Sequence, residues 1–146
     1  MPAMRRLAIL VVALGLAGAC GSSGSSKTLS KAEYVSKAND ICKLYRIKLQ
    51  NDAQQTRGVA DPSVRAKFER ATFVKDFRAQ VTALKALDPP KADNKKIDAA
   101  MKQLQSAIDD LDKKLKSDPR AAYAESYDPF RTAYNGLKRY GTTQCG

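Results

Sequence analysis

Hydrophobic side chains recur at helical spacing in four separate stretches of this 146-residue chain. In the third stretch the spacing alternates between four and three residues, which is the heptad pattern of a helix with one buried face. Its six apolar positions are Ile97, Met101, Leu104, Ile108, Leu111 and Leu115. The opposite side is polar, at Lys102, Ser106, Asp109 and Lys113. The pattern predicts a helix with one apolar face.

The other three stretches begin after residues that favour helix starts. A capping box from Ser30 to Glu33 precedes the first, and Asp61-Pro62 and Asp118-Pro119 open the second and fourth. Pro89-Pro90 ends the second, and Gly141 is expected to end the fourth. The three stripes are Tyr34, Ala38, Ile41, Tyr45 and Leu49; Phe73, Phe77, Val81, Leu84 and Leu87; and Tyr123, Tyr127, Phe130, Tyr134 and Leu137.

Four helices of similar length with short connections predict an all-α fold, an up-down-up-down four-helix bundle over residues 29–146. Pro129 falls inside the fourth helix, where Asp128-Pro129 repeats the helix-start pattern. The chain could therefore bend there or break and restart. Because the apolar stripe keeps its phase across Pro129, we expect a kink in one continuous helix.

The first 19 residues have the composition of an export signal. Arg5 and Arg6 precede an apolar run that is too short to span a bilayer. The end of this run, residues 16–20, resembles a bacterial lipobox, in which cleavage leaves a lipidated Cys20 at the new N-terminus. Ala17 stands where that motif usually has leucine, and Ala17-Gly18-Ala19 also fits ordinary signal-peptide cleavage, which would release a secreted protein.

Two observations favour the lipid over the secreted form. Residues 20–28 are rich in glycine and serine, as a flexible tether between an anchor and a domain should be. The chain also has three cysteines, and an odd thiol is unfavourable in an oxidising compartment. Acylation of Cys20 leaves two cysteines, which can form a disulfide with each other. The sequence therefore predicts an extracytoplasmic protein that acyl chains such as palmitate hold at the cell membrane.

The remaining pair, Cys42 and Cys145, is expected to form a structural disulfide. In the predicted topology the first and last helices are neighbours, and residues 141–144 are long enough to run back along the first helix. A redox-active pair is the alternative, but the two cysteines lack Cys-x-x-Cys spacing. We therefore expect a cross-link between the two ends of the domain.

The composition narrows the possible chemistry. The chain contains no histidine, which excludes Ser-His-Asp and Cys-His catalysis and histidine-ligated zinc. Its net charge is +11, or +9 once removal of residues 1–19 takes away two arginines. Outside the membrane such a charge fits lipid headgroups or an acidic envelope polymer or protein better than nucleic acid. Asp109, Asp110 and Asp112 are expected to be solvated carboxylates, and no metal, cofactor or catalytic residue is predicted.

An alternative function is carriage or sensing of a small apolar ligand. Five tyrosines are expected on the facing sides of the first and last helices, where their rings and hydroxyls could line an amphipathic cavity. This predicted tyrosine seam consists of Tyr34, Tyr45, Tyr123, Tyr127 and Tyr134. The simpler interpretation is that the rings pack in the core and the hydroxyls reach its rim.

Short motifs along residues 28–146 resemble those of a group of small actinobacterial secreted or lipid-anchored proteins. The motifs are Lys31-Ala32-Glu33-Tyr34, Ala38-Asn39-Asp40-Ile41-Cys42, the central Pro-Pro and a closing Tyr140-Gly141-x-x-x-Cys145-Gly146. The resemblance implies export, a helical build and paired cysteines, but no activity. The sequence as a whole predicts a non-enzymatic, lipid-anchored envelope protein whose basic helical bundle contacts an acidic partner.

Overall fold

The computed structural model describes residues 28–124 and 127–145. They form six helices: α1 (Lys31–Gln55), α2 (Pro62–Ala71), α3 (Phe73–Lys85), α4 (Asn94–Ser117), α5 (Pro119–Ala122) and α6 (Arg131–Tyr140). No strand occurs among the described residues, which confirms the all-α prediction. The predicted export signal, Cys20 and nearly all of the tether lie outside these residues. Within them, no helix has both the length and the apolar character needed to cross a membrane.

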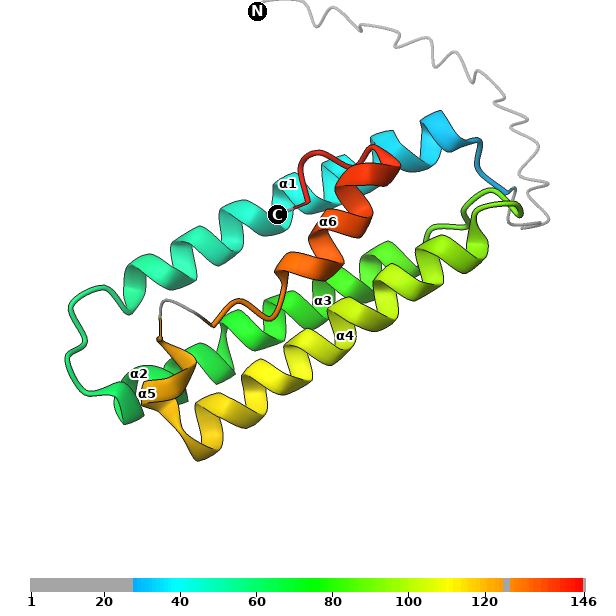
Figure 1. Cartoon of the computed structure of the whole chain (residues 1–146). Coiled ribbons are helices and arrows are strands. Elements are labelled where there is room, and N and C mark those ends of the chain that lie inside the picture. The colour runs from blue at the N-terminus through cyan, green and yellow to red at the C-terminus, as the bar shows by residue number, and fades with distance from the viewer. Residues whose placement is uncertain (1–27, 125–126, 146) are drawn as a thin grey trace, which may run out of the picture.

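Three long helices, α1, α3 and α4, run side by side and make the body of a helical bundle (Figure 1). α1 packs against α3, and α3 packs against α4. The shorter α6 packs on α4 and lies between α1 and α4 in the view of Figure 1. α2 and α5 contact each other at the end of the molecule where α1 finishes.

The predicted helix starts are confirmed by their hydrogen bonds. Ser30 and Glu33 form both bonds of the capping box: the Ser30 amide donates to Glu33 Oε2 at 2.8 Å, and the Glu33 amide donates to Ser30 Oγ at 3.3 Å. Asp61 Oδ1 accepts from the amide of Ser63 at 2.7 Å, and Asp118 Oδ1 accepts from that of Ala121 at 3.1 Å. Each cap satisfies amides that a helix leaves without internal partners.

The second helix breaks where the sequence predicted continuity. Thr72 has φ −115° and ψ −72°, which separates α2 from α3. Its hydroxyl donates to the carbonyl oxygen of Phe68 at 3.2 Å, a local bond that competes with regular helix geometry. The apolar residues that predicted this helix begin at Phe73. They therefore belong to α3, and they did not indicate how the residues of α2 would fold.

The predicted kink at Pro129 is wrong, because the chain breaks and restarts. α5 ends at Ala122 and α6 begins at Arg131. Asp128 Oδ1 accepts from the amides of Phe130 and Arg131, each at 3.1 Å. Asp128-Pro129 therefore starts a new helix, as Asp61-Pro62 and Asp118-Pro119 do. Proline has no N–H to donate to the preceding turn, so capping wins over continuation.

The heptad face of α4 is buried along its whole length, as predicted. All six of its apolar residues are buried, with exposed fractions between 0% at Ile108 and 8% at Leu111. The polar positions on its other side, including Lys102 and Lys113, are exposed. α4 therefore supplies a continuous apolar surface on which α3 and α6 pack.

The predicted disulfide between Cys42 and Cys145 is present, and both cysteines are buried. α6 ends at Gly141, whose φ of 115° is the left-handed cap that glycine favours. From there the chain runs back along α1: Gly141 lies beside Val35, and the Gln144 amide donates to Asn39 Oδ1 at 3.0 Å. The cross-link follows one helical turn further along α1.

Loss of this cross-link is expected to destabilise the domain strongly. It closes a loop with a sequence separation of 103 residues. The chain-entropy model assigns about 4–5 kcal/mol to a loop of that length, which is comparable to the whole stability of a small domain. Urea unfolding of the Cys42→Ala/Cys145→Ala variant should show this loss, and wild-type protein treated with a reductant should match the variant. An unfolding midpoint that neither change moves would contradict a structural role.

Candidate functional site

The structure does not gather the five tyrosines of the predicted tyrosine seam into one cavity. Tyr34 is fully buried and makes an edge-to-face contact with Tyr140, with ring centroids 5.8 Å apart. Tyr45 instead lies on the outer side of α1, where Lys48 Nζ is 4.8 Å from its ring centre. Tyr134 packs beside Phe130 and is the one member that borders an apolar groove among the described residues.

The other two tyrosines of the seam are held by charged side chains instead. The guanidinium of Arg65 lies 4.2 Å from the ring centre of Tyr123, at the α2–α5 end of the molecule. The hydroxyl of Tyr127 donates to Asp110 Oδ2 at 2.8 Å. Aromatic periodicity predicted that these residues would face one another, but the break before α6 takes Tyr123 out of register with Tyr134.

Asp109 and Asp110 of the acidic cluster on α4 are exposed, as predicted, but Asp109 and the half-buried Asp112 also pair with arginines, which the sequence did not indicate. Arg70 Nε is 2.7 Å from Asp112 Oδ1, and Arg78 Nη2 is 3.1 Å from Asp109 Oδ1 and 3.2 Å from Asp112 Oδ2. The hydrogen bond from Arg70 lowers the pKa of Asp112. These pairs fasten α2 and α3 to α4. The described residues contain no group of three or more histidine, cysteine or acidic side chains placed to hold a metal ion.

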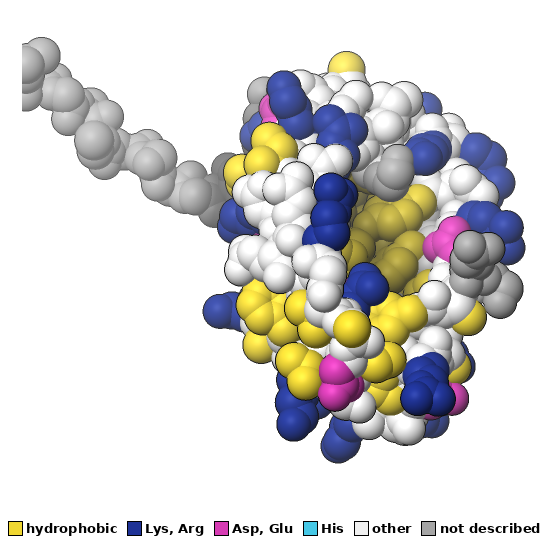
Figure 2. All heavy atoms as spheres, turned by 90° about the vertical axis from the view of Figure 1, so that its left-hand side faces the viewer, with side chains coloured by type: hydrophobic (Ala, Val, Ile, Leu, Met, Phe, Trp, Pro, Cys, Tyr) yellow, Lys and Arg dark blue, Asp and Glu magenta, His cyan; other side chains and the backbone are white. Residues whose placement is uncertain are grey.

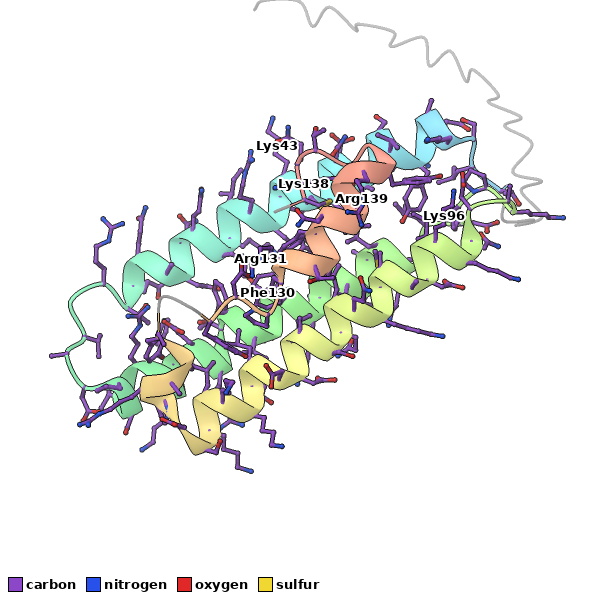
Figure 3. All side chains as sticks on the ribbon, in the orientation of Figure 1. Lys43, Lys96, Phe130, Arg131, Lys138 and Arg139 are labelled. Atoms are coloured by element: carbon purple, nitrogen blue, oxygen red, sulfur yellow. A yellow bond between two sulfur atoms is a disulfide. The ribbon has the colours of Figure 1, made fainter. Side chains whose placement is uncertain are left out.

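Positive charge remains unpaired on the side of α6. All four ion pairs among the described residues lie within α2 or between α2, α3 and α4. Figure 3 shows three exposed cations along α6, one on the neighbouring α1 and one near the start of α4. We call this set the basic face; it consists of Lys43, Lys96, Arg131, Lys138 and Arg139. None of the five takes part in those ion pairs.

The fold of α6 explains why its cations point outward. Ala133, Leu137 and Tyr140 are buried on its inner side, which leaves Arg131, Lys138 and Arg139 on the outer side. Gly136 faces α4, where an added Cβ would stand 3.9 Å from the Cβ of Ala100. That separation is an ordinary van der Waals contact, so the packing of α6 on α4 does not require glycine at this position. Segment 131–140 contains three cations and no acid, a signal that the sequence analysis overlooked.

A hollow of about 410 Å³ separates part of α6 from α4, and cations border it. Lys31, Lys96 and Arg139 line the hollow together with apolar residues of both helices. Its one carboxylate, Asp93, accepts a hydrogen bond from the Tyr140 hydroxyl at 2.9 Å. Lys31 Nζ also lies 4.9 Å from the centre of the Tyr140 ring. The hollow can therefore receive an anionic group without breaking an ion pair found among the described residues.

We expect the folded protein to lose stability at alkaline pH, because two tyrosines in this region are buried. Burial raises the pKa of Tyr34 and of Tyr140 from 10.0 to about 12 in the folded protein. The unfolded chain ionises first, so the stability present below pH 10 is lost as the pH rises from 10 towards 12. Urea unfolding at pH 8 and pH 11 measures the difference.

The Tyr34→Phe variant tests the cause of that loss. The Tyr34 hydroxyl is buried and has no hydrogen-bond partner among the described residues, so its removal should leave stability at pH 8 unchanged or raise it. The same variant should lose less stability than wild type between pH 8 and pH 11. A variant whose pH dependence equals that of wild type would show that Tyr34 does not contribute.

Comparisons with known proteins give no match: no model of a protein family, no curated protein and no solved structure matches this chain. What the protein does is therefore proposed from its own residues, chiefly the basic face and the hollow that it borders.

Proposed function

We propose that this chain is a non-enzymatic, lipid-anchored protein of the cell envelope that binds an acidic partner through the basic face. In this proposal the export signal is removed before Cys20, acyl chains on that cysteine hold the protein at the membrane, and residues 20–28 serve as the tether. The resemblance to small actinobacterial lipid-anchored proteins supports this location. The acidic partner is an envelope polymer or protein with closely spaced anionic groups.

The finer topology is also proposed. We propose an up-down-up-down bundle of four segments. The first is α1 and the third is α4. The second consists of α2 and α3, and the fourth of α5 and α6, so each of these two is broken. The contacts of α1 with α3, of α3 with α4 and of α4 with α6 support this order. In such a bundle the fourth segment ends in α6, whose ten residues include three cations and no acid.

The observation that carries the proposed function is the group of exposed cations on α6 and beside it, because α6 itself contains no acid. Arg70 and Arg78 pair with aspartates of α4, whereas the cations of α6 form no ion pair among the described residues. Exposed cations that lie close together raise the local positive potential and attract polyanions at low salt. The absence of histidine and the lack of a metal-ligating group among the described residues are consistent with function by surface contact.

Neutralising α6 should weaken binding to a polyanion more than neutralising cations elsewhere. We expect the Arg131→Gln/Lys138→Gln/Arg139→Gln variant of the mature protein to bind inorganic polyphosphate about tenfold or more weakly than wild type. Near an anionic surface each cation contributes about 1 kcal/mol at most. Titrations at several salt concentrations should also show a shallower salt dependence for the variant.

A matched control keeps the net charge equal. The Lys75→Gln/Lys85→Gln/Lys113→Gln variant removes three exposed cations of α3 and α4 that lie outside the basic face and outside the described ion pairs. It should retain most of the affinity. Equal losses in the two triple variants would mean that total charge, not the basic face, governs binding. No binding by wild type at low salt would reject the electrostatic proposal altogether.

The anchor is tested separately, by intact-mass analysis of the mature protein from its native membrane. We expect a chain that begins at Cys20 and carries the mass of a diacylglycerol and a further acyl chain. The Cys20→Ala variant should leave the membrane fraction. Full-length protein recovered from the cytosol, or a processed chain with an unmodified Cys20 in the medium, would contradict the lipid anchor.

A further inference from the structure

An apolar groove between α1 and α3 lies apart from the basic face. Its volume is about 310 Å³, and it is lined by side chains of α1 and α3, with Tyr134 of α6 and Gln144 at its border. It shares no residue with the hollow between α4 and α6. On the end of the molecule that Figure 2 presents, hydrophobic side chains form the floor of a hollow whose rim carries lysine and arginine.

Gln80 supplies a buried acceptor that the fold leaves unused. It lines the groove, its side chain is 3% exposed, and its Oε1 atom has no hydrogen-bond partner among the described residues. Burial of a carbonyl oxygen without a donor costs about 1–3 kcal/mol. Native proteins seldom leave such groups unsatisfied. The oxygen itself has almost no accessible surface, so a ligand with an O–H or N–H group would satisfy it after the Gln80 side chain turns toward the groove that it lines.

Aromatic rings form one wall of the groove. Phe73 and Phe77 meet edge to face with centroids 4.7 Å apart, and Phe77 stacks on Phe130 at 4.5 Å. Phe73 and Tyr134 are only partly buried, so the stack remains open on the groove side. Aromatic pairs in such arrangements gain about 0.5–1.5 kcal/mol beyond the burial of their area. The wall therefore favours a flat aromatic ligand over a branched aliphatic one.

The rim adds a cation that suits the same ligand. Arg46 lines the groove, is exposed and takes part in none of the ion pairs among the described residues. A guanidinium over an aromatic face is attracted by the electron density of the ring. A cavity of roughly 150 Å³ accepts benzene, so a groove of this size suits a molecule of about two rings.

We propose that the groove between α1 and α3 binds a flat aromatic molecule of about two rings that carries one hydroxyl or N–H donor. The rings pack on Phe73, Phe77 and Tyr134, and the Gln80 side chain turns so that its Oε1 accepts a hydrogen bond from the donor. This site differs from the predicted tyrosine seam, with which it shares only Tyr134. It is also independent of the proposed binding of an acidic partner.

A pair of probe molecules isolates the hydrogen bond. 4-Hydroxybiphenyl can donate to Gln80, whereas 4-methoxybiphenyl has the same rings and no donor. Calorimetric titration of the mature protein should show the hydroxyl compound binding about tenfold more tightly, as expected for a buried hydrogen bond. In the Gln80→Leu variant the affinity for the hydroxyl compound should fall to that for the methoxy compound. Equal affinities of the two probes for wild type would overturn the proposal.

A second pair of variants tests the location without touching the buried glutamine. Ala53→Trp should block the groove, because Ala53 is an exposed residue at its edge. Ile47→Trp makes the same kind of change at a position of α1 that is 50% exposed and outside the groove. We expect the first variant to lose binding of 4-hydroxybiphenyl at least tenfold and the second to keep it. Unchanged binding in Ala53→Trp would place the probe elsewhere and overturn the proposal.

Discussion

The bond between Cys42 and Cys145 is the constraint on which the rest of this structure depends. It joins the middle of α1 to the residues that follow α6, across nearly the whole domain. α6 has ten residues, and isolated helices shorter than about 12–15 residues are marginal in water. Its place on the bundle therefore depends on tertiary contacts and on the cross-link beyond its C-terminal end.

Both candidate surfaces depend on that placement of α6. On one side its exposed cations make the basic face, and its inner residues close the hollow against α4. On the other side Tyr134 and the returning chain at Gln144 border the apolar groove. The acids of α4 pair with the arginines of α2 and α3, and the cations of α6 form no ion pair among the described residues. The two proposed binding surfaces therefore lie on different sides of one short helix.

Features with local causes could be predicted from the sequence. The capping box at Ser30, the two Asp-Pro helix starts and the buried face of α4 each depend on residues a few positions apart, and all are confirmed. The disulfide was also predictable, because a bundle with adjacent ends leaves few routes for residues 141–144. In each case one strong local signal agreed with the overall architecture.

Features that depend on distant partners could not be predicted in the same way. Whether Asp128-Pro129 bends a helix or starts a new one depends on the tertiary contacts of α6. The regular spacing of apolar residues across Pro129 is compatible with both outcomes and could not distinguish them. The ion pairs of Asp109 and Asp112 could not be read from the sequence, because Arg70 lies 42 residues before Asp112 and Arg78 lies 31 residues before Asp109. The unpaired oxygen of Gln80 follows from packing between α1 and α3, and no pattern in the sequence indicates it.

Amide hydrogen exchange of the mature protein, oxidised and reduced, tests the central claim most directly. If the cross-link holds α6 in place, reduction will cost the amides of Arg131–Tyr140 more protection than those along the buried face of α4. If the amides of α6 are equally protected in the two forms, the helix keeps its position without the disulfide and the account is contradicted.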